Sequence, residues 1–87
     1  MPVYMPQLDD ASKRVLRAIQ RLGVAPGWQV MKEAPVSDQD LVAAAQVLIS
    51  SGLVKASGNV SNPAAIAKTY FNIQPSNAGL VEYVLSS

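Results

Sequence analysis

Gly23, Pro35 and Gly52 divide the first part of the chain into short segments, because proline and a left-handed glycine both end helices. Residues 11–22 have apolar side chains at helical spacing after two aspartates that can cap them, which predicts a helix. Residues 28–34 predict a short helix, and the segment from Ser37 to residue 51 a longer one that Ser37 caps. A chain divided in this way forms small helices that pack around one core.

The second part of the chain predicts a β-hairpin. Residues 53–57 and 69–74 both read as strands, and the second has Tyr70, Asn72 and Gln74 on one side with Phe71 and Ile73 on the other. Their connection, residues 58–68, is long for a hairpin, and within it Asn62 is suited to cap a helical turn that has Pro63 at its first position.

Pro75 and Ser76 then open a last short helix that ends at residue 85. Residues 1–8 are expected to form an N-terminal arm and residues 9–87 a single domain, since 87 residues suffice for one core only. Apolar residues make up 49% of the chain and charged residues 15%, so the chain buries enough surface to fold. The predicted fold class is α+β.

The chain contains neither cysteine nor histidine. A disulfide framework, a thiolate metal site and the commonest general base are therefore excluded. Acid–base chemistry would have to come from six carboxylates, most of which lie at predicted helix starts: Asp9, Asp10, Glu33, Asp38, Asp40 and Glu82. Two of them, Asp38 and Asp40, are two residues apart on one turn and point in different directions. We therefore expect no enzyme, no metal and no cofactor.

The sequence gives no sign of a membrane or export role. Residues 1–6 lack the basic start and the apolar core of a signal peptide, and no window approaches 18 uninterrupted apolar residues. A cytoplasmic location is the expectation.

Trp28 is the only tryptophan. A lone tryptophan in a small domain usually packs, so a core or half-buried anchor is expected in preference to a residue that stacks on a ligand.

Basic residues concentrate on the first predicted helix. The net charge of +1 is too small to indicate a nucleic-acid partner, but four of the seven cations lie there: Lys13, Arg14, Arg17 and Arg21. Residues 13, 17 and 21 follow one i, i+4 row. The row is either an ordinary solvated helix face or a surface that contacts anions such as phosphates.

Two motifs give the chain a family resemblance. The first is Val36-Ser37 leading into a helix that ends Leu48-Ile49-Ser50-Ser51-Gly52-Leu53-Val54, and the second is Tyr70-Phe71-Asn72-Ile73-Gln74-Pro75-Ser76-Asn77-Ala78-Gly79. In their order and spacing, residues 11–85 resemble winged helix-turn-helix regulators of the bacterial MarR and PadR kind. The resemblance implies three helices, a two-stranded wing hairpin and a short C-terminal helix.

The resemblance also implies DNA binding through the third helix, but the residues there depart from the family pattern. Its start and exposed side carry Ser37, Asp38, Gln39, Asp40, Ala43 and Gln46. The two carboxylates repel phosphates, which leaves Gln39 and Gln46 as candidate base readers. In the wing, Lys55 and Lys68 are candidate backbone contacts, and the tip residues Asn59, Ser61 and Asn62 either hydrogen-bond to a groove or form a solvated loop.

Two functions remain open at this stage. The first is a nucleic-acid-binding regulator that holds DNA through the first helix and the wing. The second is a winged helix that binds another protein through its alanine-rich third helix and its wing. Because family members commonly dimerise through terminal helices, a homodimer that pairs through Val81 and Tyr83 or through Leu85 is also expected.

Overall fold

The first helix has the capped ends that its sequence predicts. In the computed structural model of the chain, which describes residues 8–86, α1 spans Asp10–Leu22. The Asp9 side chain accepts a hydrogen bond from the Ser12 amide at 2.8 Å. Gly23, at φ +81°, donates its amide to the Ile19 carbonyl at 2.9 Å and ends the helix. Most of the proposed N-terminal arm lies outside the described residues, although Leu8 packs, partly buried, against the core.

The helix-turn-helix consists of α2 (Gly27–Glu33) and α3 (Asp38–Ser50). The Ser37 hydroxyl caps α3 by accepting from the Asp40 amide at 3.1 Å. Gly52, at φ +80°, follows the last turn of α3. The helix therefore ends where the sequence predicts.

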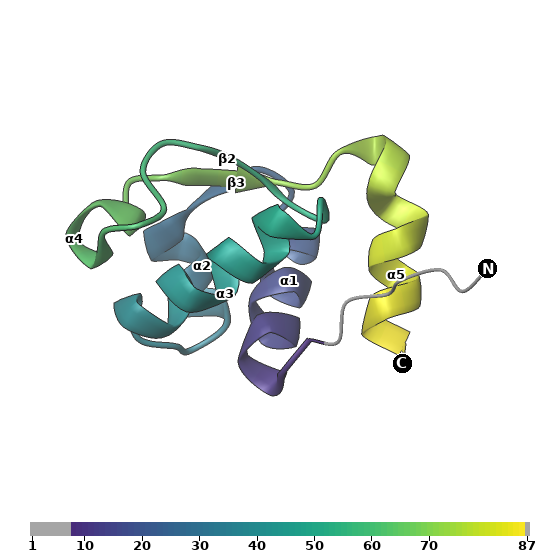
Figure 1. Cartoon of the computed structure of the whole chain (residues 1–87), viewed down its shortest axis with the longest axis horizontal. Coiled ribbons are helices and arrows are strands. Elements are labelled where there is room, and N and C mark those ends of the chain that lie inside the picture. Colours follow the sequence, from purple (N-terminus) through teal and green to yellow (C-terminus); the bar gives the residue numbers. More distant parts are fainter. Residues whose placement is uncertain (1–7, 87) are drawn as a thin grey trace.

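A small antiparallel sheet follows the helices. β2 (Lys55–Ser57) and β3 (Tyr70–Asn72) form the predicted hairpin, with Ala56 opposite Phe71. The structure adds a strand that the sequence did not predict: β1 (Ala25–Pro26) pairs with the other edge of β3, which gives the order β1-β3-β2. In Figure 1 these strands run along one side of the molecule, with α1, α2 and α3 on the other side of the sheet.

The long connection of the hairpin folds back onto the helices. It contains α4 (Pro63–Ile66), which Asn62 caps by accepting from the Ala64 amide at 2.8 Å. The Ile66 side chain is fully buried, and the connection is held at its base by the buried Thr69 hydroxyl, which donates to the Asn59 carbonyl at 2.6 Å. The predicted helical turn is thus present and serves to close the wing.

The C-terminal helix packs beside α1, at the opposite end of the molecule from α4 (Figure 1). A 3₁₀ turn, η1 (Pro75–Asn77), leads into α5 (Ala78–Ser86). The Asn77 amide group donates to the Gly52 carbonyl at 2.7 Å, which ties this turn to the end of α3. Val81 and Val84 of α5 are buried.

The core lies between α1, α3 and the sheet. Its largest fully buried apolar side chains are Leu16, Ile19, Leu41, Leu48, Leu53, Ile66 and Phe71. They come from α1, α3, the segment before β2, α4 and β3. Helices and sheet therefore share one hydrophobic core.

Two side chains depart in part from what the sequence predicts. Trp28 is not in the core, because 55% of it is exposed at the start of α2, so only the half-buried alternative fits. There Gly27 and Trp28 bond to the wing through their backbone amides. Val81 is fully buried and is not available to a second subunit, whereas Tyr83 is 62% exposed.

Candidate nucleic-acid interface

The four cations of α1 lie on its outer side, because the opposite side of this amphipathic helix is buried in the core. Arg14, Arg17 and Arg21 are exposed and Lys13 is half-buried. Together with Asp10, Ala18 and the end of α2, they line a surface hollow of about 430 Å³. The structure thus gathers this predicted set around one concave surface.

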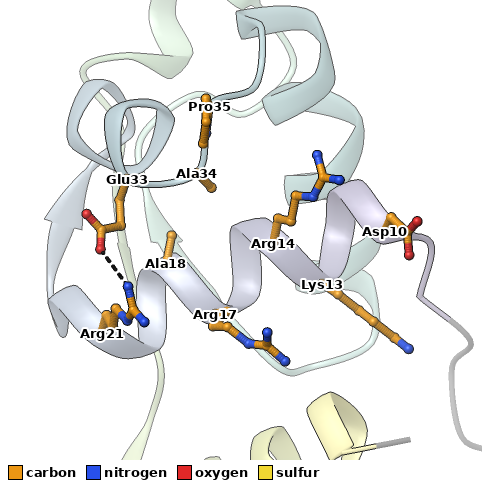
Figure 2. Close-up of a pocket in the computed structure, with 9 residues that line it drawn as sticks. All are labelled: Asp10, Lys13, Arg14, Arg17, Ala18, Arg21, Glu33, Ala34 and Pro35. Atoms are coloured by element: carbon orange, nitrogen blue, oxygen red, sulfur yellow. Dashed lines mark hydrogen bonds and ion pairs between the residues drawn. The ribbon is translucent and has the colours of Figure 1, made fainter.

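The side chains of this set diverge, as Figure 2 shows. Arg14 extends toward the α2–α3 side of the hollow, whereas Lys13 and Arg17 extend from the other side of α1. Arg21 turns toward α2, where its Nη1 lies 3.3 Å from Oε1 of Glu33. The predicted row of residues 13, 17 and 21 therefore splits, and one of its cations is already engaged by a carboxylate.

Carboxylates reduce the positive charge of this surface. Asp10 and Glu33 line the same hollow as the four cations, and Glu82 of α5 shares a second hollow with Arg17. The Arg21–Glu33 pair is exposed, at 72% and 37% of the two side chains, so water weakens it. The pair therefore restrains the Arg21 side chain only weakly.

The two glutamines of α3 have different surroundings. Gln39 is exposed in the first turn of α3. Its backbone amide donates to Oδ1 of Asp38 at 2.8 Å. Gln46 is exposed about two turns further along the same side of α3, and its Nε2 lies 3.5 Å from the Val60 carbonyl of the wing connection. Gln39 is thus open to solvent beside two carboxylates, while Gln46 makes a long contact with the wing.

The wing lysines lie at opposite ends of the hairpin. Lys55 begins β2 and is paired with Asn72, whereas Lys68 follows α4 near the tip, and both are exposed. At the tip, Asn59 accepts from the Ser61 amide at 2.7 Å and Asn62 caps α4. Both asparagine side chains therefore stabilise the loop itself.

The described residues contain no group of three or more potential metal ligands. Within residues 8–86, every buried side-chain nitrogen and oxygen has a hydrogen-bond partner. Hydrogen bonding from the Ser12 side chain, and then from its backbone amide, lowers the pKa of Asp9 from its usual value. This shift belongs to a helix cap, so it gives no indication of acid–base chemistry.

No helix in the described part of the chain is long and apolar enough to cross a membrane. Searches against models of protein families and against curated proteins gave no match.

The fold itself has a close counterpart among solved structures. The chain superposes with a TM-score of 0.72 on BpsR of Bordetella bronchiseptica, a protein whose DNA binding is regulated by 6-hydroxynicotinic acid. The sequences are 20% identical over 92% of this chain, and the match spans 55% of BpsR. The chain thus corresponds to about half the length of that regulator. The shared arrangement of helix-turn-helix, hairpin and final helix establishes that this chain has a winged helix-turn-helix fold.

Proposed function

We propose that this chain is a DNA-binding module of the transcription-regulator type, related to MarR and PadR regulators. The observation that carries the proposal is the set of four cations around the hollow of α1 in a winged helix-turn-helix fold. Lys13, Arg14, Arg17 and Arg21 contact phosphates of a duplex, and Lys55 and Lys68 contact the backbone from the wing.

The charge of α3 is the reason for assigning these contacts to α1 and the wing. Asp38 and Asp40 are exposed in its first turn, and its sequence Asp38–Ser50 holds no basic residue. Carboxylates at this position repel phosphates. Base contacts from α3 are therefore limited to Gln39 and Gln46, and affinity depends on backbone contacts that do not discriminate sequence.

The proposal includes a homodimer and a cytoplasmic location. The outer side of α5 exposes Leu80 at 39% and Tyr83 at 62%, and Leu85 is half-buried. We assign to this side of α5 the contact with a second copy, which would place two basic surfaces on one duplex.

A salt series on duplex binding tests the proposal. Each phosphate contact contributes about 0.9 to the slope of log K against log salt. The variant Arg14→Gln/Arg17→Gln should therefore bind more weakly, with a slope smaller by about 1.8. The matched variant Arg14→Lys/Arg17→Lys keeps both charges and should retain the slope. Absence of duplex binding at low salt, or a Gln variant with an unchanged slope, would refute the proposal.

A second candidate function is a protein-interaction module. It is favoured by the outer side of α3, where Ala43 and the 43% exposed Val47 lie beyond an acidic first turn. A large charged side chain at position 43 would obstruct such a contact. Ala43→Arg should abolish capture of a protein partner while leaving duplex binding at least as strong as before, and unchanged capture counts against this function.

A further inference from the structure

The hollow of α1 has two ends of different chemistry. Figure 2 shows Arg14 at one end, toward the α2–α3 side, and Glu33 with Arg21 at the other. Arg14 and Arg21 are seven residues apart on α1, which separates them by about 10 Å along the helix axis. Lys13 and Arg17 extend from the other side of α1, away from the space between these ends. That space is therefore cationic at one end and offers a carboxylate at the other.

Small apolar residues line the middle of the hollow. Ala18 of α1 and Ala34 after α2 lie between the two ends, and they are only 3% and 5% exposed. Pro35 follows Ala34 and adds an exposed ring to the same lining. The volume of about 430 Å³ is within the range of sites that hold small organic molecules. The middle of the hollow therefore suits a flat body of low polarity.

The polar groups at both ends have hydrogen-bonding capacity left. Among residues 8–86, the Arg14 guanidinium makes no hydrogen bond or ion pair. Arg21 contacts Oε1 of Glu33 at 3.3 Å, which leaves Oε2 to accept a further hydrogen bond. Asp10, one turn before Arg14, lies on the far side of Arg14 from Glu33 (Figure 2). A ligand in the hollow thus meets a planar donor group at one end and an acceptor at the other.

From this arrangement we infer that the hollow binds a nucleoside monophosphate whose base carries an amino group. The phosphate accepts from the Arg14 guanidinium, whose planar fork matches phosphate oxygens. The base lies on the small apolar lining, and its amino group donates to Glu33.

Other small anions fit the two ends less well. An α-amino acid is too short, because its ammonium and carboxylate groups are attached to the same carbon atom. A dicarboxylate would place its second anion beside Glu33. A nucleotide has its phosphate and the amino edge of its base at opposite ends of the molecule. The inference goes beyond duplex binding, because it requires Glu33 and does not require Arg17.

Cytidine and uridine monophosphate are matched probes, since they differ at the position that Glu33 contacts. Cytosine presents an amino group there, from which a carboxylate accepts, whereas uracil presents a carbonyl oxygen that a carboxylate repels. The cytidine nucleotide should therefore bind at least about tenfold more tightly. Titrations followed by NMR of the whole chain measure both affinities, and shifts of the Ala18 and Ala34 methyl signals locate the ligand.

Variants separate the two ends of the hollow. Arg14→Gln should weaken binding of cytidine monophosphate by about tenfold or more, because it removes a charged donor. Arg17→Gln removes the same charge from the other side of α1, so this matched control should keep the affinity. Glu33→Gln should bring the two nucleotides to similar affinities, because a glutamine amide both donates and accepts. All three residues are exposed, so the variants are expected to fold.

Four results would overturn the inference. They are equal affinities of the natural protein for the two nucleotides, unshifted Ala18 and Ala34 methyl signals, inorganic phosphate that binds as tightly as cytidine monophosphate, and a loss from Arg17→Gln as large as that from Arg14→Gln. Arg17→Gln should weaken duplex binding without affecting the nucleotide. Glu33→Gln should remove the nucleotide preference without weakening duplex binding, so failure of this inference and failure of the proposed duplex function are measured separately.

Discussion

Gly27 sets how closely α2 approaches the wing, and its replacement by alanine should destabilise the fold. A Cβ atom at this position would lie 2.0 Å from the Ile66 carbonyl oxygen and 2.9 Å from its carbon. Both are main-chain atoms, so relief requires movement of α4 or of α2. That movement would disturb the bond from the Gly27 amide to the Thr69 carbonyl, which measures 2.8 Å.

The size of the effect follows from two opposing contributions. Overpacking of a closely packed site costs about 1–3 kcal/mol, and a clash with main chain belongs at the upper end. Replacing glycine also lowers the conformational entropy of the unfolded chain, which stabilises the folded state by about 0.4–1 kcal/mol. Gly27→Ala should therefore lower the free energy of unfolding by about 2 kcal/mol and the Tm by about 8–16 °C.

Urea denaturation followed by far-UV circular dichroism measures this change. Gly79→Ala is the matched control, because a Cβ atom there meets no atom within 4 Å and α5 gains a better helix former. The control should gain about 0.5–1 kcal/mol. If Gly27→Ala were as stable as the natural chain, the close approach of α2 and the wing would be refuted.

Three further substitutions test the cap, the wing and the basic surface. Asp9→Ala should cost about 1 kcal/mol in urea denaturation at pH 7. Because the pKa of Asp9 is lowered in the folded state, the ionic part of this contribution is complete above the ordinary aspartate pKa of about 3.9 and should be lost as the pH falls from there through the lower pKa of the folded state. Thr69→Val removes the donor to the Asn59 carbonyl and should cost about 1–3 kcal/mol in the same assay. Arg21→Ala breaks only the exposed pair with Glu33 and should lower the free energy of unfolding by less than about 1 kcal/mol. A larger decrease in thermal unfolding would contradict the conclusion that water weakens this pair.

The elements with strong local signals could be predicted from the sequence. The helix caps at Asp9, Ser37 and Asn62 each bond to a backbone group only two or three residues away. The glycine that follows α3 is likewise a local signal. Local chemistry alone determines such features, so periodicity and capping rules suffice to place them.

The strand β1 and the position of Trp28 could not be predicted in this way. Residues 24–27 read as a turn because they contain Pro26 and Gly27, and Ala25 and Pro26 become a strand only because β3 pairs with them from more than 40 residues away along the sequence. The same pairing directs the start of α2 toward the wing and leaves Trp28 exposed. The expectation that a lone tryptophan packs rests on composition, whereas the exposure of Trp28 is decided by this tertiary pairing.

The near-neutral total charge conceals an uneven distribution of charge along the chain. Of the seven cations, four lie on α1, one lies on α2 and two, Lys55 and Lys68, lie on the wing. The first group shares its hollow with Asp10 and Glu33, and Glu82 approaches Arg17 from α5. The wing and its return, residues 53–81, contain no aspartate or glutamate. A total charge near zero can hide local regions of one sign when the charges are unevenly distributed. Here the carboxylates cluster at the starts of α1 and α3 and around the α1 hollow, so residues 53–81 keep a positive charge that the sum for the whole chain does not reveal.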